Sequence, residues 1–79
     1  MKGNICGNKI KELRTSKQWS QVELSAALSV DYGLVLDQSD ISEIERGVRG
    51  VKDYELKALA EIFGVKITSL IEDSFNEYF

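Results

Sequence analysis

The stretch LDQSDISEIERG, residues 36–47, decides the fold of this chain. Ile41 and Ile44 recur at the spacing of one buried helix face. Asp37 is a typical N-cap residue, and Gly47 is a natural left-handed residue at a helix end. The stretch therefore predicts a short helix that begins after Asp37 and ends before Gly47.

The outer face of this predicted helix carries residue types that read DNA, but the stretch is acidic. At about 100° per residue, one polar face opposite the two isoleucines collects Gln38, Ser39, Ser42, Glu43 and Arg46. The same twelve letters hold four carboxylates: Asp37, Asp40, Glu43 and Glu45. Because phosphates repel carboxylates, any nucleic-acid function has to account for these four groups.

The flanking sequence predicts further helices and no strand, because apolar residues recur at helical spacing and proline is absent. Ser20 and Glu23 form a capping-box pattern before a helix over about 21–28, and Thr68 is expected to cap the last helix. Residues 29–36 are expected to form a loop with a buried, extended segment over 34–36. The remaining helices are expected over about 8–17 and 53–63. The predicted fold is all-α, a compact five-helix bundle with short connections.

Length and composition indicate one domain over residues 1–79. The chain has a single cysteine, Cys6, which excludes an internal disulfide and fits a reducing compartment. We expect Cys6 to serve as a small, partly buried apolar residue. There is no apolar run of the ~20 residues that cross a membrane and no amino-terminal signal pattern. We therefore expect a cytoplasmic protein without membrane contact.

The charge is unevenly distributed along the chain. The net charge is −3, which is unusual for a general polyanion binder. Residues 1–52 hold eight Lys/Arg against seven Asp/Glu, whereas residues 53–79 hold two against six. Any nucleic-acid surface is therefore expected within the first two thirds of the chain.

The residues also match a known pattern. The segments GNKIKELRTSKQWSQVELSAAL, SDISEIERGVR and YELKALAEIFGVKITSLIE closely resemble the helix-turn-helix domain of the lambdoid phage repressor and Cro family, also called the Xre family. The resemblance covers a core of residues 7–72 and leaves 73–79 as an extension of the last helix. It implies a five-helix bundle that binds operator DNA, usually as a dimer, and regulates transcription.

The resemblance assigns roles to individual positions. Gln21 and Gln38 align with DNA-contacting positions, one near a phosphate and the other on a base edge, where glutamine can pair with adenine. Ser39, Ser42 and Glu43 share the reading face, and Glu43 could accept a hydrogen bond from a cytosine amino group. Phosphate contacts are expected from Arg46, Arg49 and Lys52. The competing interpretation is that these residues are an ordinary solvated surface.

The resemblance also implies an ion pair between Arg14 and Glu45 that ties the first helix to the reading helix. Such a pair accounts for one of the four carboxylates. The sequence departs from the family in two respects. The connection before Asp37 is longer than the usual tight turn, with Ser29 in place of the turn glycine, and the reading helix is acidic.

Three aromatic residues near the C-terminus, Phe75, Tyr78 and Phe79, recur at helical spacing. They could pack on their own core or form a dimer contact, and the sequence leaves both interpretations open.

The sequence predicts a binding protein and not an enzyme. It has no histidine, no metal-ligand cluster and no glycine-rich phosphate loop, so no cofactor, metal or small-molecule ligand is expected. The predicted function is a sequence-specific DNA-binding transcriptional regulator, a repressor that reads a two-fold operator as a homodimer. The alternative is a protein-interaction module of the same fold, antitoxin-like or a regulator's partner, with weak or no DNA binding. The net acidity favours this alternative.

Overall fold

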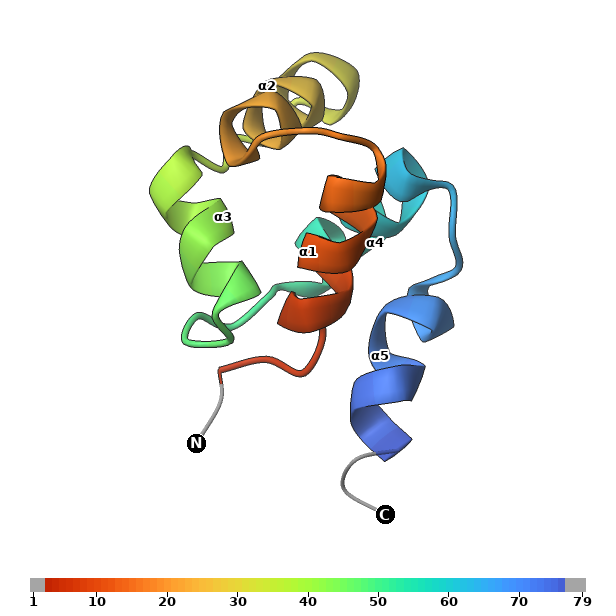
Figure 1. The fold of residues 1–79 in the computed structure, drawn as a ribbon. Coiled ribbons are helices and arrows are strands. Elements are labelled where there is room, and N and C mark those ends of the chain that lie inside the picture. Colours follow the sequence, from red (N-terminus) through yellow and green to blue (C-terminus); the bar gives the residue numbers. More distant parts are fainter. Residues whose placement is uncertain (1–2, 77–79) are drawn as a thin grey trace.

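The computed structural model describes residues 3–76, with side chains through Ile71. Five helices and no strand make up this part of the chain: α1 (Gly7–Ser16), α2 (Gln21–Tyr32), α3 (Gln38–Glu45), α4 (Asp53–Phe63) and α5 (Ile67–Asn76). Figure 1 shows them as a compact bundle. The predicted all-α, five-helix fold is confirmed.

The core is built around α1, which contacts α3, α4 and α5, while α2 packs on α3 and α4. The largest fully buried side chains come from every helix: Ile10, Leu24, Leu28, Ile41, Ile44, Leu59 and Leu70. Because Ile41 and Ile44 face inward, the opposite face of α3 points away from the core. In Figure 1, α3 lies at one margin of the molecule, beside α1 and below α2.

Helix α2 is longer than predicted, because it continues to Tyr32 and does not end at Leu28. Its last turn carries the 83% exposed Val30 and buries little, so hydrophobic periodicity gave no sign of it. Gly33 ends the helix in the left-handed conformation (φ 62°), which glycine adopts without strain. The lengthened connection is thus partly an added helical turn.

The connection from α2 to α3 is only partly buried, which corrects the expectation of a buried segment over 34–36. Leu36 is 2% exposed and Leu34 is half-buried, but Val35 between them is 81% exposed. An extended chain places successive side chains on opposite sides, so only alternate residues reach the core. The Ser25 hydroxyl on α2 donates a hydrogen bond to the Leu36 carbonyl and fixes this segment to the bundle.

Asn4 organises the beginning of α1, a role that the sequence did not suggest. Its Oδ1 accepts hydrogen bonds from the Cys6 and Gly7 amides at 3.0 and 2.8 Å. Its Nδ2 donates to the Ile44 carbonyl at 3.0 Å and to the Arg49 carbonyl at 2.7 Å. One side chain therefore caps α1 and joins it to the end of α3. Burial raises the pKa of the adjacent Cys6 thiol, which is 3% exposed.

Helix α1 approaches the end of α3 closely enough to require glycine. A Cβ atom added at Gly7 would lie 2.3 Å from the Ile44 carbonyl oxygen and 2.9 Å from that of Glu45. Both neighbours are backbone atoms, so they cannot move aside as a flexible side chain can. Gly7 therefore sets how near the two helices lie.

Two expectations about the C-terminal helix have different outcomes. Helix α5 begins at Ile67, so Thr68 lies inside its first turn and is not its cap. The Phe75 side chain and residues Tyr78 and Phe79 lie outside the described residues. Within residues 3–76, none of the helices has both the length and the apolar character to cross a membrane.

Candidate nucleic-acid interface

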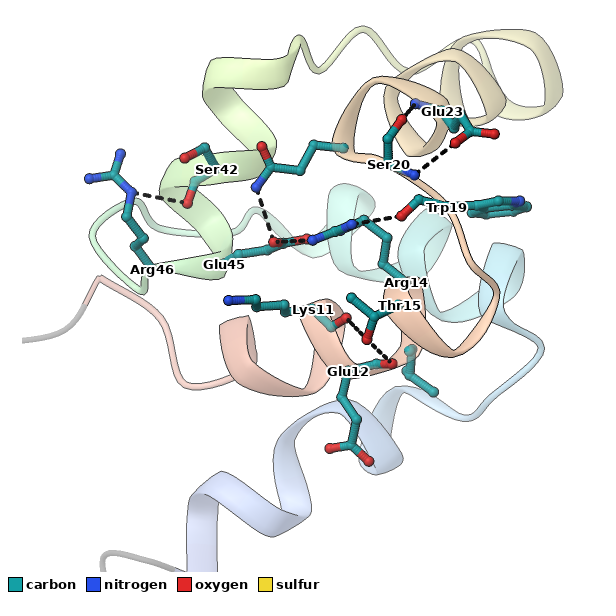
Figure 2. Close-up of polar contacts among 12 residues, drawn as sticks. Lys11, Glu12, Arg14, Thr15, Trp19, Ser20, Glu23, Ser42, Glu45 and Arg46 are labelled. Carbon is teal, nitrogen blue, oxygen red and sulfur yellow. Dashed lines mark hydrogen bonds and ion pairs between the residues drawn. The ribbon is translucent and has the colours of Figure 1, made fainter.

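The outward face of α3 carries five polar side chains, as its periodicity predicts. Gln38, Ser39 and Arg46 are exposed, while Ser42 and Glu43 are half-buried. The Arg46 guanidinium reaches back over the helix, its Nε donating to the Ser42 carbonyl at 3.4 Å. Figure 2 shows this guanidinium at the outer edge of α3, away from the Arg14 side chain.

The start of α3 accounts for two of its carboxylates. Asp37 Oδ1 accepts a hydrogen bond from the Asp40 amide at 2.8 Å, and Asp40 Oδ2 accepts one from the Asp37 amide at 3.1 Å. This reciprocal capping box satisfies backbone donors at the positive end of the helix. Asp37 is the expected cap, whereas its reciprocal hydrogen bond with Asp40 was not predicted.

The structure brings Arg14 and Glu45 together in a buried, two-pronged ion pair. Arg14 Nε lies 2.6 Å from Glu45 Oε2, and Nη2 lies 3.0 Å from Oε1. The two side chains are 10% and 3% exposed. Arg14 also donates through Nη1 to the Trp19 carbonyl at 2.6 Å, and Figure 2 shows it stretched between these partners. The hydrogen bond with Glu45 raises the pKa of the guanidinium.

Gln21 joins this pair. Its Nε2 donates to Glu45 Oε1 at 3.1 Å, so the first residue of α2 is fixed to the last residue of α3. Together the three side chains link α1, α2 and α3 at one point. This contact was not predicted from the sequence, because the partners are 24 residues apart. The DNA contact expected of Gln21 stays a prediction.

Arg49 has a different environment from the one expected of a phosphate-binding residue. Its guanidinium donates to both carboxylate oxygens of Glu55, each at 3.0 Å, and its Nε lies 3.8 Å from Asp40. The hydrogen bond with Glu55 raises the Arg49 pKa, and Asp40 and Glu43 add to that shift. Arg49 thus neutralises acidic groups of the bundle, and phosphate contact by its 25% exposed side chain stays a prediction.

Arg46 and Lys52 are exposed cations that lie close to α3 in the sequence. Arg46 lies at the end of the helix, and Lys52 immediately precedes α4, with its ammonium 5.8 Å from the centre of the Tyr54 ring. Both can reach solvent, whereas Arg14 and Arg49 are held by carboxylates. Because Glu45 is buried and paired with Arg14, one of the four carboxylates of residues 36–47 does not contribute to this surface.

A comparison with family models matches residues 10–70 to the model described as helix-turn-helix, the Xre and lambda-repressor type. The chain belongs to this helix-turn-helix family. The match spans most of the chain and includes the whole of α2, α3 and α4. No curated protein and no solved structure shows significant similarity to the chain.

Membership in the helix-turn-helix family makes the chain a DNA-binding regulatory domain. In this motif the second helix is the recognition helix, which lies in the major groove, while the first crosses the DNA backbone. Here α2 and α3 are the first and second helices of the motif. Among the side chains that the structure describes, residues 3–71, there is no group of three or more histidine, cysteine or acidic residues placed to hold a metal ion.

Proposed function

We propose that this helix-turn-helix protein is a sequence-specific transcriptional repressor that reads operator DNA with α3 in the major groove. Gln38, Ser39, Ser42 and Glu43 are the proposed base-reading residues. Arg46 and Lys52 are the proposed phosphate contacts, and the start of α2 at Gln21 lies beside the backbone. A protein bound in this way blocks access to the DNA it covers, so repression needs no second surface.

One observation carries the proposal: three of the four carboxylates of residues 36–47 have partners inside the protein. Asp37 and Asp40 cap the helix, and Glu45 binds Arg14. The exposed part of the reading face is then left with Gln38, Ser39 and Arg46, which are residue types that contact bases or phosphates. Glu43 is the remaining acidic group on that face.

We propose a homodimer as the DNA-bound form. Two copies related by a two-fold axis would place their α3 helices in successive major grooves, ~34 Å apart. The sequence offers Phe75, Tyr78 and Phe79 as the contact between the copies. Sedimentation of the protein with and without a two-fold duplex measures the stoichiometry, and one monomer per duplex would contradict this arrangement.

A protein-interaction module of the same fold is the second candidate function. The observation that favours it is electrostatic: the net charge is −3, and two of the arginines are held internally by glutamates. Low positive charge weakens the sequence-independent attraction to DNA. A module of this kind would bind another protein and only weakly bind DNA.

A salt titration separates the two functions. Duplexes are selected from a randomised library with the full chain, and their affinity is measured between 50 and 200 mM salt, roughly the range over which phosphate contacts respond. Two phosphate contacts per subunit predict a slope of about −4 for log K against log salt in a dimer. The interaction module predicts weak or no binding even at low salt, with no duplex sequence preferred.

Arg46→Gln is the informative variant, with Lys57→Gln on α4 as its control. Loss of one phosphate contact per subunit should reduce the slope by about 2 in a dimer. Lys57 is exposed on α4, a helix that carries none of the proposed base or phosphate contacts, so its replacement should leave the slope unchanged. Equal slopes for both variants would exclude Arg46 from the interface.

A further inference from the structure

Val35 is an exposed apolar side chain on a segment that is fixed in place. It is 81% exposed, whereas Leu36 beside it is 2% exposed. The Leu34 amide donates to the Leu28 carbonyl at 3.2 Å, the Ser25 hydroxyl donates to the Leu36 carbonyl, and Asp37 begins the α3 capping box. The backbone is therefore held on both sides of Val35.

Val35 lies close along the chain to the first residue of the reading face. Leu34 and Leu36 turn inward, so Val35 points away from the core, as the polar face of α3 does. Val35 lies three residues before Gln38, a separation of at most about 10 Å along the chain. In Figure 1 this connection leads directly into the first turn of α3. With α3 in the major groove, as proposed, Val35 lies no farther than this from the first residue of the reading helix.

The chemistry of the major groove identifies what such a side chain can recognise. Each base pair presents hydrogen-bonding groups there, and the apolar feature is the C5-methyl group of thymine. A valine cannot donate or accept a hydrogen bond, but its two methyl groups can pack on that methyl. Because valine is β-branched and stiff at χ1, it loses little side-chain freedom on contact.

We propose that Val35 is a specificity-determining residue that contacts the C5-methyl group of a thymine next to the base read by Gln38. This inference rests on the proposed function, because it requires α3 to lie in the major groove. It adds a residue outside the helix to the reading surface. The lengthened connection then contributes to sequence recognition as well as joining the two helices.

Isolated exposed valines are common on protein surfaces, and Val30 supplies a matched control. Val30 is 83% exposed, close to the value for Val35, but it lies on the last turn of α2. Val30→Ala and Val35→Ala remove the same atoms from equally exposed sites. Both variants should keep the unfolding midpoint of the parent chain, so a difference in DNA affinity would not reflect folding.

The test replaces each thymine of a selected duplex in turn by deoxyuridine, which lacks only the C5-methyl group. Affinity is measured by fluorescence anisotropy for the parent chain and for the two variants. At one position the parent chain should lose about three- to fivefold in affinity, the effect of one apolar contact. Val35→Ala should bind the thymine duplex more weakly by a similar factor and be insensitive to uridine there. Val30→Ala should behave as the parent chain does.

The outcomes distinguish this inference from the function on which it rests. If the parent chain and Val35→Ala lose the same affinity at every thymine, Val35 reads no methyl group and the inference is wrong, while DNA reading stands. If no duplex is bound at low salt, the proposed function fails and the inference fails with it.

Discussion

Removing the Glu45 carboxylate should cost this chain a large part of its stability. In Glu45→Ala the buried Arg14 guanidinium loses both of its hydrogen bonds to the carboxylate and keeps only the one to the Trp19 carbonyl. Leaving one member of a buried pair without its partner costs about 3–5 kcal/mol. A domain of this size has a total unfolding free energy of roughly 4–12 kcal/mol. The variant should therefore lose between about a quarter and all of its stability.

Urea unfolding followed by circular dichroism measures this loss. The control is Glu12→Ala on α1, because Glu12 is 71% exposed and lies 3.7 Å from Lys9 in a surface pair. Exposed pairs contribute about 0–1 kcal/mol, so that variant should unfold close to the parent chain. A double variant, Arg14→Met with Glu45→Leu, removes both charges and should recover much of the lost stability.

A small effect would refute the reasoning. If Glu45→Ala lowers the unfolding free energy by less than about 1 kcal/mol, the pair behaves as a surface pair does and does not hold α1 against α3. If the double variant is less stable than Glu45→Ala, a buried charge without its partner is not the source of the loss.

Three further predictions concern pH, base reading and packing. The hydrogen bond from Arg49 lowers the pKa of Glu55 below its usual value of 4.5. The ionised Glu55 therefore stabilises the fold fully above pH 4.5, and this stabilisation is lost as the pH falls through the lower pKa of the folded state. Glu55→Gln should flatten this acid dependence in unfolding experiments. Glu43→Gln should change base preference at one operator position if Glu43 reads cytosine, whereas a uniform rise in affinity would show that it only repels phosphate. Gly7→Ala should lower the unfolding free energy by about 1–3 kcal/mol, because its Cβ would overlap the Ile44 carbonyl.

Each of these predictions has a matched control or an outcome that contradicts it. Glu61→Gln replaces an exposed glutamate on the same helix as Glu55, and equal acid dependence in the two variants would rule out the Arg49 contact as the cause. Gly50→Ala is the control for Gly7→Ala, because its Cβ would meet only the Gly3 carbonyl oxygen at 3.5 Å, an ordinary contact. Equal stability of the two alanine variants would show that α1 can move away from α3.

Helix caps and buried helix positions, which involve only a few neighbouring residues, could be predicted from the sequence. Ser20 and Glu23 form the predicted capping box, with hydrogen bonds of 3.0 and 2.9 Å. Asp37 caps α3 where expected, and Ile41 and Ile44 are buried. These features depend on interactions within one helical turn, so the spacing of residues in the sequence is sufficient to identify them. The resemblance to a known family added the pairing of Arg14 with Glu45.

The sequence by itself determined the five helices, their order and the polar face of α3. Only the tertiary structure decided which polar groups remain available on that face. Gln21 binds Glu45, Arg49 binds Glu55, and Asn4 bridges the ends of α1 and α3. The Gln21 and Asn4 contacts join residues that are far apart in the chain. All three contacts depend on how the helices and connections pack together, and the spacing of residues in the sequence does not reveal that packing. The sequence therefore shows only that residues 36–47 are acidic, whereas the folded structure determines which of these charges lie on the surface.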